Sequence, residues 1–379
     1  MLQKKLWMFP LMFGIIGSLI GLVLRYAFTG SISAFPFKNF LHAHSHVMLL
    51  GFIFNGLLIM VWKYFTDGID KWSYRYYLIL QGCVLAMLVA FLIEGYAFYS
   101  ILFSTIHLWI SYILMIRLWK RIKGNNTLTQ FVKAGIIFHF ISSLGPYLLG
   151  PLMIMEMHNS PWYQQAIFFY LHFQYFGVFF IWMLAVLLKN AQLNLSKNNS
   201  LIILISLVLL FSHSLDYSFD HYVINIIGFG ASLFLFLVLF KLKSALVTGK
   251  TNSNILFKII LLIAFLNIIG SIPAVANLVV ESRFLLIAWL HLIFLGMYVP
   301  FIWISFKKKI NAITWSTYAF FVLMTEMCLV FPGAISEFSP ISLMWLLFIT
   351  YLGVFILICI VHFQLIFHLN KRSTNLIEA

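Results

Sequence analysis

The sequence predicts an all-α integral membrane protein with about twelve transmembrane helices. Of its 379 residues, 63% are hydrophobic and only 9% are charged, whereas soluble domains are about 45–50% apolar and about 25% charged. The apolar residues form runs of about 20 without the alternating pattern of barrel strands. Because a bilayer offers no hydrogen bonds to the backbone, such runs are expected to be helices.

Twelve apolar segments are expected to span the membrane. No long linker separates them, so residues 1–379 are expected to form a single polytopic transmembrane domain. The expected spans cover residues 7–28, 41–64, 75–96, 98–119, 128–152, 163–188, 199–213, 220–242, 254–277, 284–306, 312–332 and 341–369.

The basic residues indicate the orientation of these helices. Of 24 lysines and arginines, only Arg25, Lys38 and Arg283 fall on one side of the predicted membrane, and the other 21 fall on the opposite side. Lys and Arg concentrate on the cytoplasmic side, so both termini are predicted to be cytoplasmic and the protein to lie in the inner (cytoplasmic) membrane. The net charge of +14 is explained by these short clusters, which contact lipid headgroups. Nucleic acid is not an expected partner.

Three histidines begin similar strings on the second, sixth and tenth predicted helices. The strings are His46-Val-Met-Leu-Leu-Gly51, His172-Phe-Gln-Tyr-Phe-Gly177 and His291-Leu-Ile-Phe-Leu-Gly296. A spacing of about four helices predicts three four-helix pseudo-repeats, roughly at residues 1–124, 125–250 and 251–379. The three helices run in the same direction, so their histidines are expected at matching depth in the outer half of the bilayer.

His107, His213 and His221 are expected in the same layer, with His139 closer to the middle, and His44 lies two residues before His46. Neutral imidazole binds haem iron and copper well, and polar groups inside a membrane usually mark a site. A hydrogen bond to a neighbouring helix is the simpler explanation for any single one of them. The pattern of three favours a metal or haem site.

The layout resembles the haem–copper oxidase and nitric oxide reductase superfamily, whose catalytic subunit has twelve helices in three four-helix arcs. The string His44-Ser-His46-Val-Met-Leu-Leu-Gly51-Phe52 is also similar to a segment of NnrS-type proteins, which contain haem and copper and act in nitric oxide tolerance. The resemblance implies a haem-binding protein in redox or nitric oxide and oxygen chemistry, and makes the chain a candidate oxidoreductase.

The resemblance also implies roles for individual residues. His46 and His291 match the two axial ligands of a haem b, with His44 as a neighbouring candidate. His172 matches a ligand of a second metal, copper or non-haem iron. His213 is a candidate second ligand there, and His107 and His139 are substitutes. Quinol or another small electron donor and a diatomic gas are the implied partners, because no C-x-x-C-H motif for covalent haem is present.

The sequence departs from the oxidases at the second metal site. Trp289 stands where a second helix-ten histidine is expected, and His213 is flanked by Ser212 and Ser214 instead of another histidine. The tyrosine expected four residues after His172 is replaced by Phe176. The ordinary binuclear centre cannot be built from these residues, so proton-pumping oxygen reduction is not expected.

Few other polar residues lie within the apolar segments. Glu326 is a candidate proton relay, and a hydrogen-bonded structural role explains it equally well. His362 and His368 are interpreted as interfacial. Two alternatives to a haem protein stay open: a transporter or metal handler that uses the histidine layer, and a structural subunit in which the histidines only pack.

Overall fold

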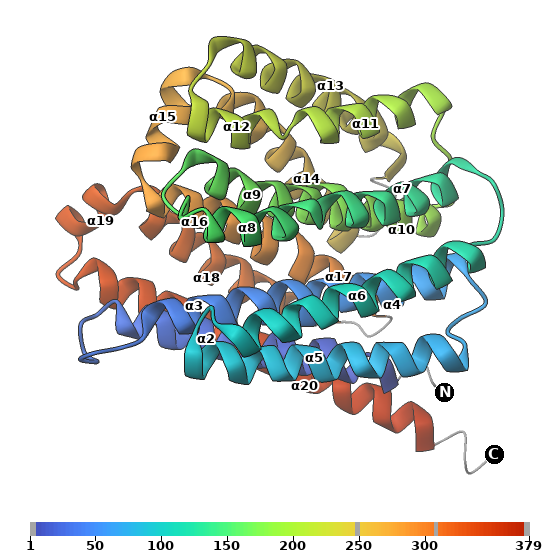
Figure 1. Cartoon of the computed structure of the whole chain (residues 1–379), viewed down its shortest axis with the longest axis horizontal. Coiled ribbons are helices and arrows are strands. Elements are labelled where there is room, and N and C mark those ends of the chain that lie inside the picture. The colour runs from blue at the N-terminus through green and yellow to red at the C-terminus, as the bar shows by residue number, and fades with distance from the viewer. Residues whose placement is uncertain (1–4, 247–250, 307–309, 375–379) are drawn as a thin grey trace. The chain divides into compact units, whose positions relative to one another are not determined.

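A computed structural model describes residues 5–246, 251–306 and 310–374, and all regular structure in these ranges is helical (Figure 1). Eleven helical segments of this described part are long and apolar enough to cross a membrane. A twelfth is present if the bent pair Asn254–Gly270 and Pro273–Glu281 is one span. The chain is therefore an all-α, multi-pass membrane protein with about twelve spans, as the sequence predicts.

Contacts between the helices divide the chain into two compact units. The first unit comprises Met1–Lys120 and Phe294–Ala379, and the second comprises Arg121–Ile293. The single domain and the three four-helix repeats expected from the sequence remain predictions.

The first unit is built from the two ends of the chain. Its elements are α2 (Met8–Ala27), α3 (Phe37–His46), the π-helix η1 (Val47–Phe54), α4 (Asn55–Phe65), α5 (Lys71–Glu94), α6 (Phe98–Arg121), most of the π-helix η3 (Leu292–Tyr298), α17 (Val299–Ser305), α18 (Ala312–Val330), α19 (Pro332–Phe338) and α20 (Leu343–Thr374).

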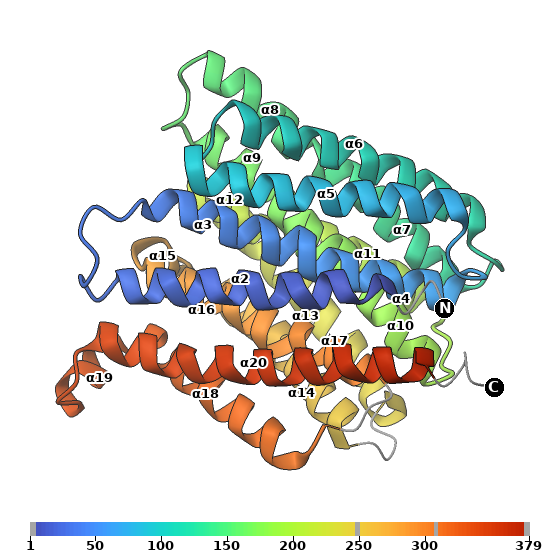
Figure 2. The same cartoon turned by 90° about the horizontal axis from the view of Figure 1, so that it is seen from below.

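Helix α2 lies between α3 and α20 in this unit (Figure 2). Small residues on α2 allow this close approach. A Cβ atom added at Gly21 would lie 2.7 Å from the Tyr351 hydroxyl of α20 and 2.9 Å from Cε1 of His44 in α3. Only glycine leaves room for both side chains, as is common where membrane helices pack closely.

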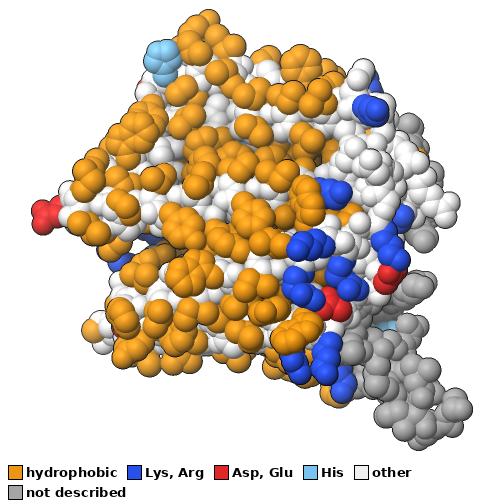
Figure 3. Space-filling model, turned by 45° about the vertical axis from the view of Figure 1, so that its right-hand side comes forward, with side chains coloured by type: hydrophobic (Ala, Val, Ile, Leu, Met, Phe, Trp, Pro, Cys, Tyr) orange, Lys and Arg blue, Asp and Glu red, His pale blue; other side chains and the backbone are white. Residues whose placement is uncertain are grey.

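Asp70 organises one end of the first unit. Its carboxylate accepts hydrogen bonds from the amides of Trp72 and Ser73 at the start of α5, where amides lack helical partners. Arg117, near the end of α6, forms an ion pair with it at 2.6 Å. Lys63 near the end of α4 and Lys71 at the start of α5 belong to the same end of this unit. Figure 3 shows Lys and Arg side chains gathered beside a mainly hydrophobic surface.

The second unit consists of a continuous stretch of chain. Its elements are α7 (Thr127–Ser142), α8 (Leu144–Ile154), α9 (Pro161–His172), the π-helix η2 (Phe173–Phe179), α10 (Phe180–Asn190), α11 (Lys197–Leu209), α12 (Ser212–Phe219), α13 (Tyr222–Leu246), α14 (Thr251–Gly270), α15 (Pro273–Glu281) and α16 (Arg283–His291).

The run from α9 through η2 to α10 is the most buried span of this unit. It contacts α7, α8, α11 and α12. Trp182 of α10 is fully buried and donates through Nε1 to the Val132 carbonyl of α7 at 3.1 Å. This hydrogen bond satisfies the indole N–H, which buried tryptophan requires.

Several predicted spans of the second unit are interrupted, and the span expected at 128–152 is divided at Ser143 into α7 and α8. The segment expected at 254–277 is two helices that meet at 99°, because α14 ends at Gly270 and Pro273 begins α15. The segment expected at 199–213 extends to Phe219 but has a turn at Leu210 and Phe211 between α11 and α12. Hydropathy predicts the spans and does not detect these breaks.

Candidate functional site

Each of the three histidine strings adopts the same local structure. His46, His172 and His291 are the last residues of α3, α9 and α16, and each is followed directly by a π-helix. The glycine of each string lies within that π-helix. π-helical turns are rare and occur frequently at functional sites. The repeat detected in the sequence is therefore also a repeat of backbone structure at these three places.

The first π-helix has a side chain that satisfies its backbone. Asn55, which is fully buried at the start of α4, donates to the Gly51 carbonyl at 2.9 Å and to Gln81 Oε1 of α5 at 2.8 Å. A side-chain donor of this kind helps to satisfy a buried main-chain carbonyl. The wider turn after His46 is thereby held against α5.

His46 is oriented by a main-chain hydrogen bond. Its Nδ1 lies 2.9 Å from the carbonyl oxygen of His42, so the Nδ1 hydrogen is donated there. The half-buried ring lies against Phe91 of α5, with 4.3 Å between ring centroids. This arrangement leaves the lone pair on Nε2, which is the state in which histidine binds a metal.

His44 is held in the same manner on the other side of α3. Its Nδ1 lies 2.7 Å from the Gly17 carbonyl of α2. Residues two apart are about 200° apart around a helix, so His44 faces α2 whereas His46 faces α5. The two candidates do not converge on one point.

His291, the predicted second haem ligand, is half-buried at the end of α16. It belongs to the second unit and His46 to the first. The pairing of these two residues therefore remains a prediction from the sequence.

His172 is fully enclosed and hydrogen-bonds to a neighbouring helix. Its Nε2 lies 2.8 Å from the Leu207 carbonyl of α11. The turn after α11 explains why this carbonyl is available, because the Phe211 amide bonds to Val208 instead of Leu207. His172 thus makes the kind of hydrogen bond to a neighbouring helix that is the simpler explanation for a single membrane histidine.

The other candidates for a second metal are also engaged. His213 Nε2 lies 3.1 Å from the Ser232 hydroxyl, and His139 Nδ1 lies 3.1 Å from the Gln174 amide. His107 is buried near Phe54 in the first unit. In the described part of the chain, no three His, Cys, Asp or Glu side chains are grouped so that they could hold a metal ion.

Glu326 belongs to a polar cluster of the first unit. Arg25 is only 5% exposed, and its guanidinium carbon lies 5.4 Å from the centre of the Tyr351 ring. Glu326 lies close enough to interact electrostatically with Arg25, and its Oε1 is buried without a hydrogen-bond partner. The sequence predicts Glu326 as a candidate functional residue. It does not predict this for Arg25, which was used only to infer the orientation of the helices.

His362 is buried among the helices of the first unit, and its predicted interfacial depth in the membrane stays a prediction. Its side chain is 0% exposed, Nδ1 lies 2.9 Å from the Leu11 carbonyl of α2, and Nε2 has no partner. Helix α20 has 32 residues, which is longer than the bilayer requires. A histidine near the end of the apolar run can therefore still lie within the packed part of the unit.

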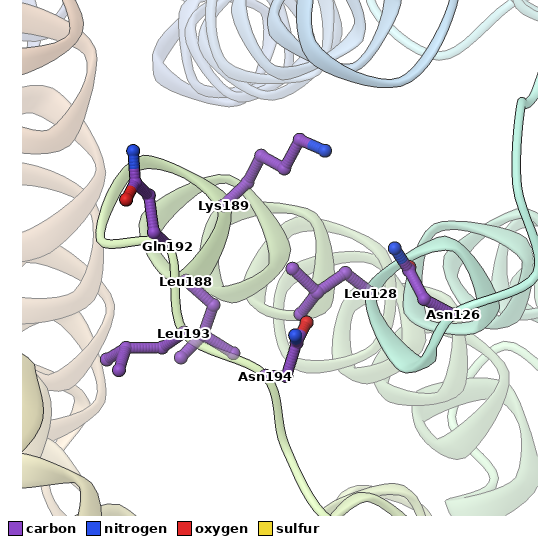
Figure 4. A pocket seen from close by; sticks show the side chains of 7 residues that line it. All are labelled: Asn126, Leu128, Leu188, Lys189, Gln192, Leu193 and Asn194. Carbon is purple, nitrogen blue, oxygen red and sulfur yellow. The ribbon is translucent and has the colours of Figure 1, made fainter.

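A surface pocket of about 420 Å³ lies elsewhere in the second unit (Figure 4). None of the candidate histidines lines it. The residues that line it are Asn126, Leu128, Leu188, Lys189, Gln192, Leu193 and Asn194.

Comparison with protein-family models and with curated proteins finds no match for this chain. The resemblance to the haem–copper oxidases therefore rests on the sequence motifs, and the function is inferred from the residues themselves.

Proposed function

We propose that the chain is a haem-binding protein of the inner membrane that acts in redox or nitric oxide and oxygen chemistry, with His46 as an iron ligand. The orientation of His46 supports this proposal most directly. Its Nδ1 hydrogen is bonded to the His42 carbonyl, which fixes the ring and leaves Nε2 for the metal. A hydrogen bond at the second nitrogen is the usual way in which proteins orient metal-binding histidines.

The surroundings of His46 fit a haem ligand. Phe91 packs against the ring and Tyr96 lies 6.2 Å from its centre, so one side of the imidazole is covered by aromatic carbon. Haem b, when bound with two histidine ligands, would supply one-electron transfer. A diatomic gas would instead bind at the proposed second metal, where coordination positions would stay open. His291 is the proposed opposite ligand, and quinol or another small donor is the proposed source of electrons.

The optical spectrum of the purified protein tests the proposal. A low-spin haem with two histidine ligands gives a sharp Soret band and a sharp α band on reduction. We expect both bands in the wild type and their loss in His46→Ala. His158→Ala, which removes an exposed loop histidine, should keep both bands. Wild-type protein that is purified after growth with added haem precursor and still shows no band would contradict the proposal.

A second metal, copper or non-haem iron, would have to bind differently from the arrangement in the oxidases. His172 and His213 both use Nε2 in hydrogen bonds, so each would bind metal through Nδ1 or exchange its present partner. Metal analysis of the purified protein, with iron compared against haem content, decides whether a second ion is present.

One observation favours the alternative of a transporter or metal handler. The 99° bend between Asn254–Gly270 and Pro273–Glu281 is the kind of broken helix that transporters use at their binding sites. Under this alternative the purified protein would contain no stoichiometric haem, and His46→Ala would leave its absorption unchanged.

A further inference from the structure

Helices α5 and α6 of the first unit both carry an exposed basic side chain next to an exposed apolar one. Ile79 of α5 and Ile116 of α6 are each 48% exposed. Arg75 lies four residues before Ile79, and Lys120 lies four residues after Ile116. Residues at this spacing are neighbours on the surface of a helix. On both helices, therefore, a cation stands one turn away from an isoleucine that faces the lipid.

Hydrogen bonds from Arg117 bring these two helix ends together. Its Nη2 donates to Asp70 Oδ1, just before α5, at 2.6 Å, and its Nε donates to the Ser73 hydroxyl of α5 at 3.1 Å. Lys120 is three residues after Arg117 and is thus its neighbour on the surface of α6. The exposed amine of Lys120 therefore belongs to the same place as the start of α5.

The positive charge at this place exceeds the negative charge. Lys71 and Arg75 of α5 and Lys120 of α6 are exposed, and in the described part of the chain none of the three forms an ion pair. Asp70 is already paired with a different arginine. Asp67, which is exposed, is the other acidic residue of the loop before α5. Three cations on two helices thus face a single remaining carboxylate.

The surroundings of these cations select the kind of ligand. Trp72 is 54% exposed, and the Arg75 guanidinium carbon lies 4.9 Å from the centre of its ring. Tryptophan concentrates at the level of the lipid headgroups, so the contact holds the charge at that level. A soluble anion or an acidic protein would use the cations alone. A phospholipid joins a phosphate to acyl chains, and so matches both the cations and the exposed isoleucines beside them.

We propose that Lys71, Arg75 and Lys120 bind the headgroup of an anionic phospholipid whose acyl chains lie against Ile79 and Ile116. Clusters of basic residues beside membrane helices attract anionic lipid. A zwitterionic lipid carries its own cation, which competes for the phosphate, and therefore binds less well. The site belongs to the first unit alone and does not depend on haem binding.

The test is native mass spectrometry of the protein in a neutral detergent, titrated with phosphatidylglycerol or with phosphatidylcholine of the same acyl chains. We expect saturable, tighter binding of phosphatidylglycerol. Arg75→Gln and Lys120→Gln should each weaken it about fivefold, the contribution of one basic residue near anionic lipid. Lys38→Gln removes an exposed cation near the opposite end of α5, where Asn39 lies against Gly95, and should leave the affinity unchanged.

Equal affinity of the wild type for the two lipids would contradict the proposal, since the cations would then only set the orientation of the helices. A preference for phosphatidylglycerol that survives in the Arg75→Gln, Lys120→Gln double variant would place the lipid elsewhere. Competition by glycerol phosphate, which has no acyl chains, would indicate a site for a soluble anion instead. If a variant does not fold, the wild-type comparison and the glycerol phosphate competition still decide the question.

Discussion

At the scale of single residues, the histidines differ in which ring nitrogen is bonded to the protein. Nδ1 forms a hydrogen bond with a main-chain carbonyl in His44, His46 and His362. His172 and His213 instead use Nε2. The histidines of the first group keep Nε2 available, as a metal-binding histidine requires. The histidines of the second group use Nε2 for a hydrogen bond to a neighbouring helix, as a structural histidine does.

His172→Ala should therefore destabilise the fold without changing a haem spectrum. The substitution leaves the Leu207 carbonyl without a donor, because the Phe211 amide bonds elsewhere. A buried carbonyl without a partner costs about 1–3 kcal/mol. Thermal unfolding should report the loss, while the Soret and α bands remain. A metal ion that disappears with this variant would instead show that His172 is a ligand.

Asp70 should make stability depend on pH at the end of α5. Burial alone would raise the pKa of its carboxyl, but hydrogen bonds from Ser73 and the guanidinium of Arg117 hold that pKa well below its ordinary value. The folded state thus binds the proton less well than the unfolded state. The stabilisation is present above the unfolded carboxyl pKa of about 3.9 and is lost as pH falls toward the folded pKa.

Two substitutions separate the helix cap from the charge at Asp70. Asp70→Asn keeps an acceptor for the α5 amides and removes the ion pair, which is partly exposed and worth about 0–1 kcal/mol. Asp70→Ala also removes the cap, at a further cost of about 1 kcal/mol. Unfolding followed between pH 7 and pH 3 should show a steeper loss in wild type than in Asp70→Asn. Equal slopes would show that Asp70 is not involved.

The sequence predicts which residue types matter better than it predicts their surroundings. Histidines inside apolar segments stand out because polar groups there are costly. The partners of His172 and the burial of His362 could not be predicted, since both depend on tertiary contacts with α11 and α2. Arg25 was assigned to a helix end from its position, whereas packing against α20 buries it.

At the scale of elements, the π-helices explain why the histidine strings were detectable while their geometry was not. Each residue turns an α-helix by about 100°, so a π-turn changes which faces align on either side of it. Spacing rules for regular helices then fail across Val47–Phe54. The three strings share the same spacing from histidine to glycine. This shared spacing indicates a common structure, but it does not indicate a π-helix.

Glycines of α8 provide a test of packing between elements. A Cβ atom at Gly145 would overlap the Ala166 carbonyl oxygen of α9, while a Cβ at Gly150 meets nothing within 4 Å. Gly145→Ala should cost about 1–3 kcal/mol through overpacking. Gly150→Ala should be neutral or stabilising, because alanine favours a helix by up to about 1 kcal/mol. Chemical denaturation compares them, and equal effects would contradict the close approach of α8 and α9.

At the scale of the whole molecule, hydropathy predicts the number of spans because bilayer thickness fixes the length of each apolar run. Hydropathy does not report the direction of a helix axis, so the 99° bend after Gly270 could not be predicted. The proline at the start of α15 was the available signal. The division of the chain into two compact units likewise cannot be predicted from hydropathy.

The predicted orientation in the membrane rests on the basic residues and can be measured with reporters. A reporter fused after Ala379 should be active on the cytoplasmic side, and one inserted near His158 should be active outside. The reason is that the predicted topology places 21 of the 24 lysines and arginines on the side of the termini. The reverse result at either position would contradict the proposed topology.

The most direct test of the central proposal is the haem spectrum of His46→Ala with and without imidazole. Free imidazole can occupy the space of the deleted ring and bind iron in its place. We predict that the variant loses the sharp low-spin bands of the wild type and regains them on addition of imidazole, while His158→Ala keeps them throughout. Low-spin bands that persist in His46→Ala without imidazole would contradict the assignment of His46 as an iron ligand.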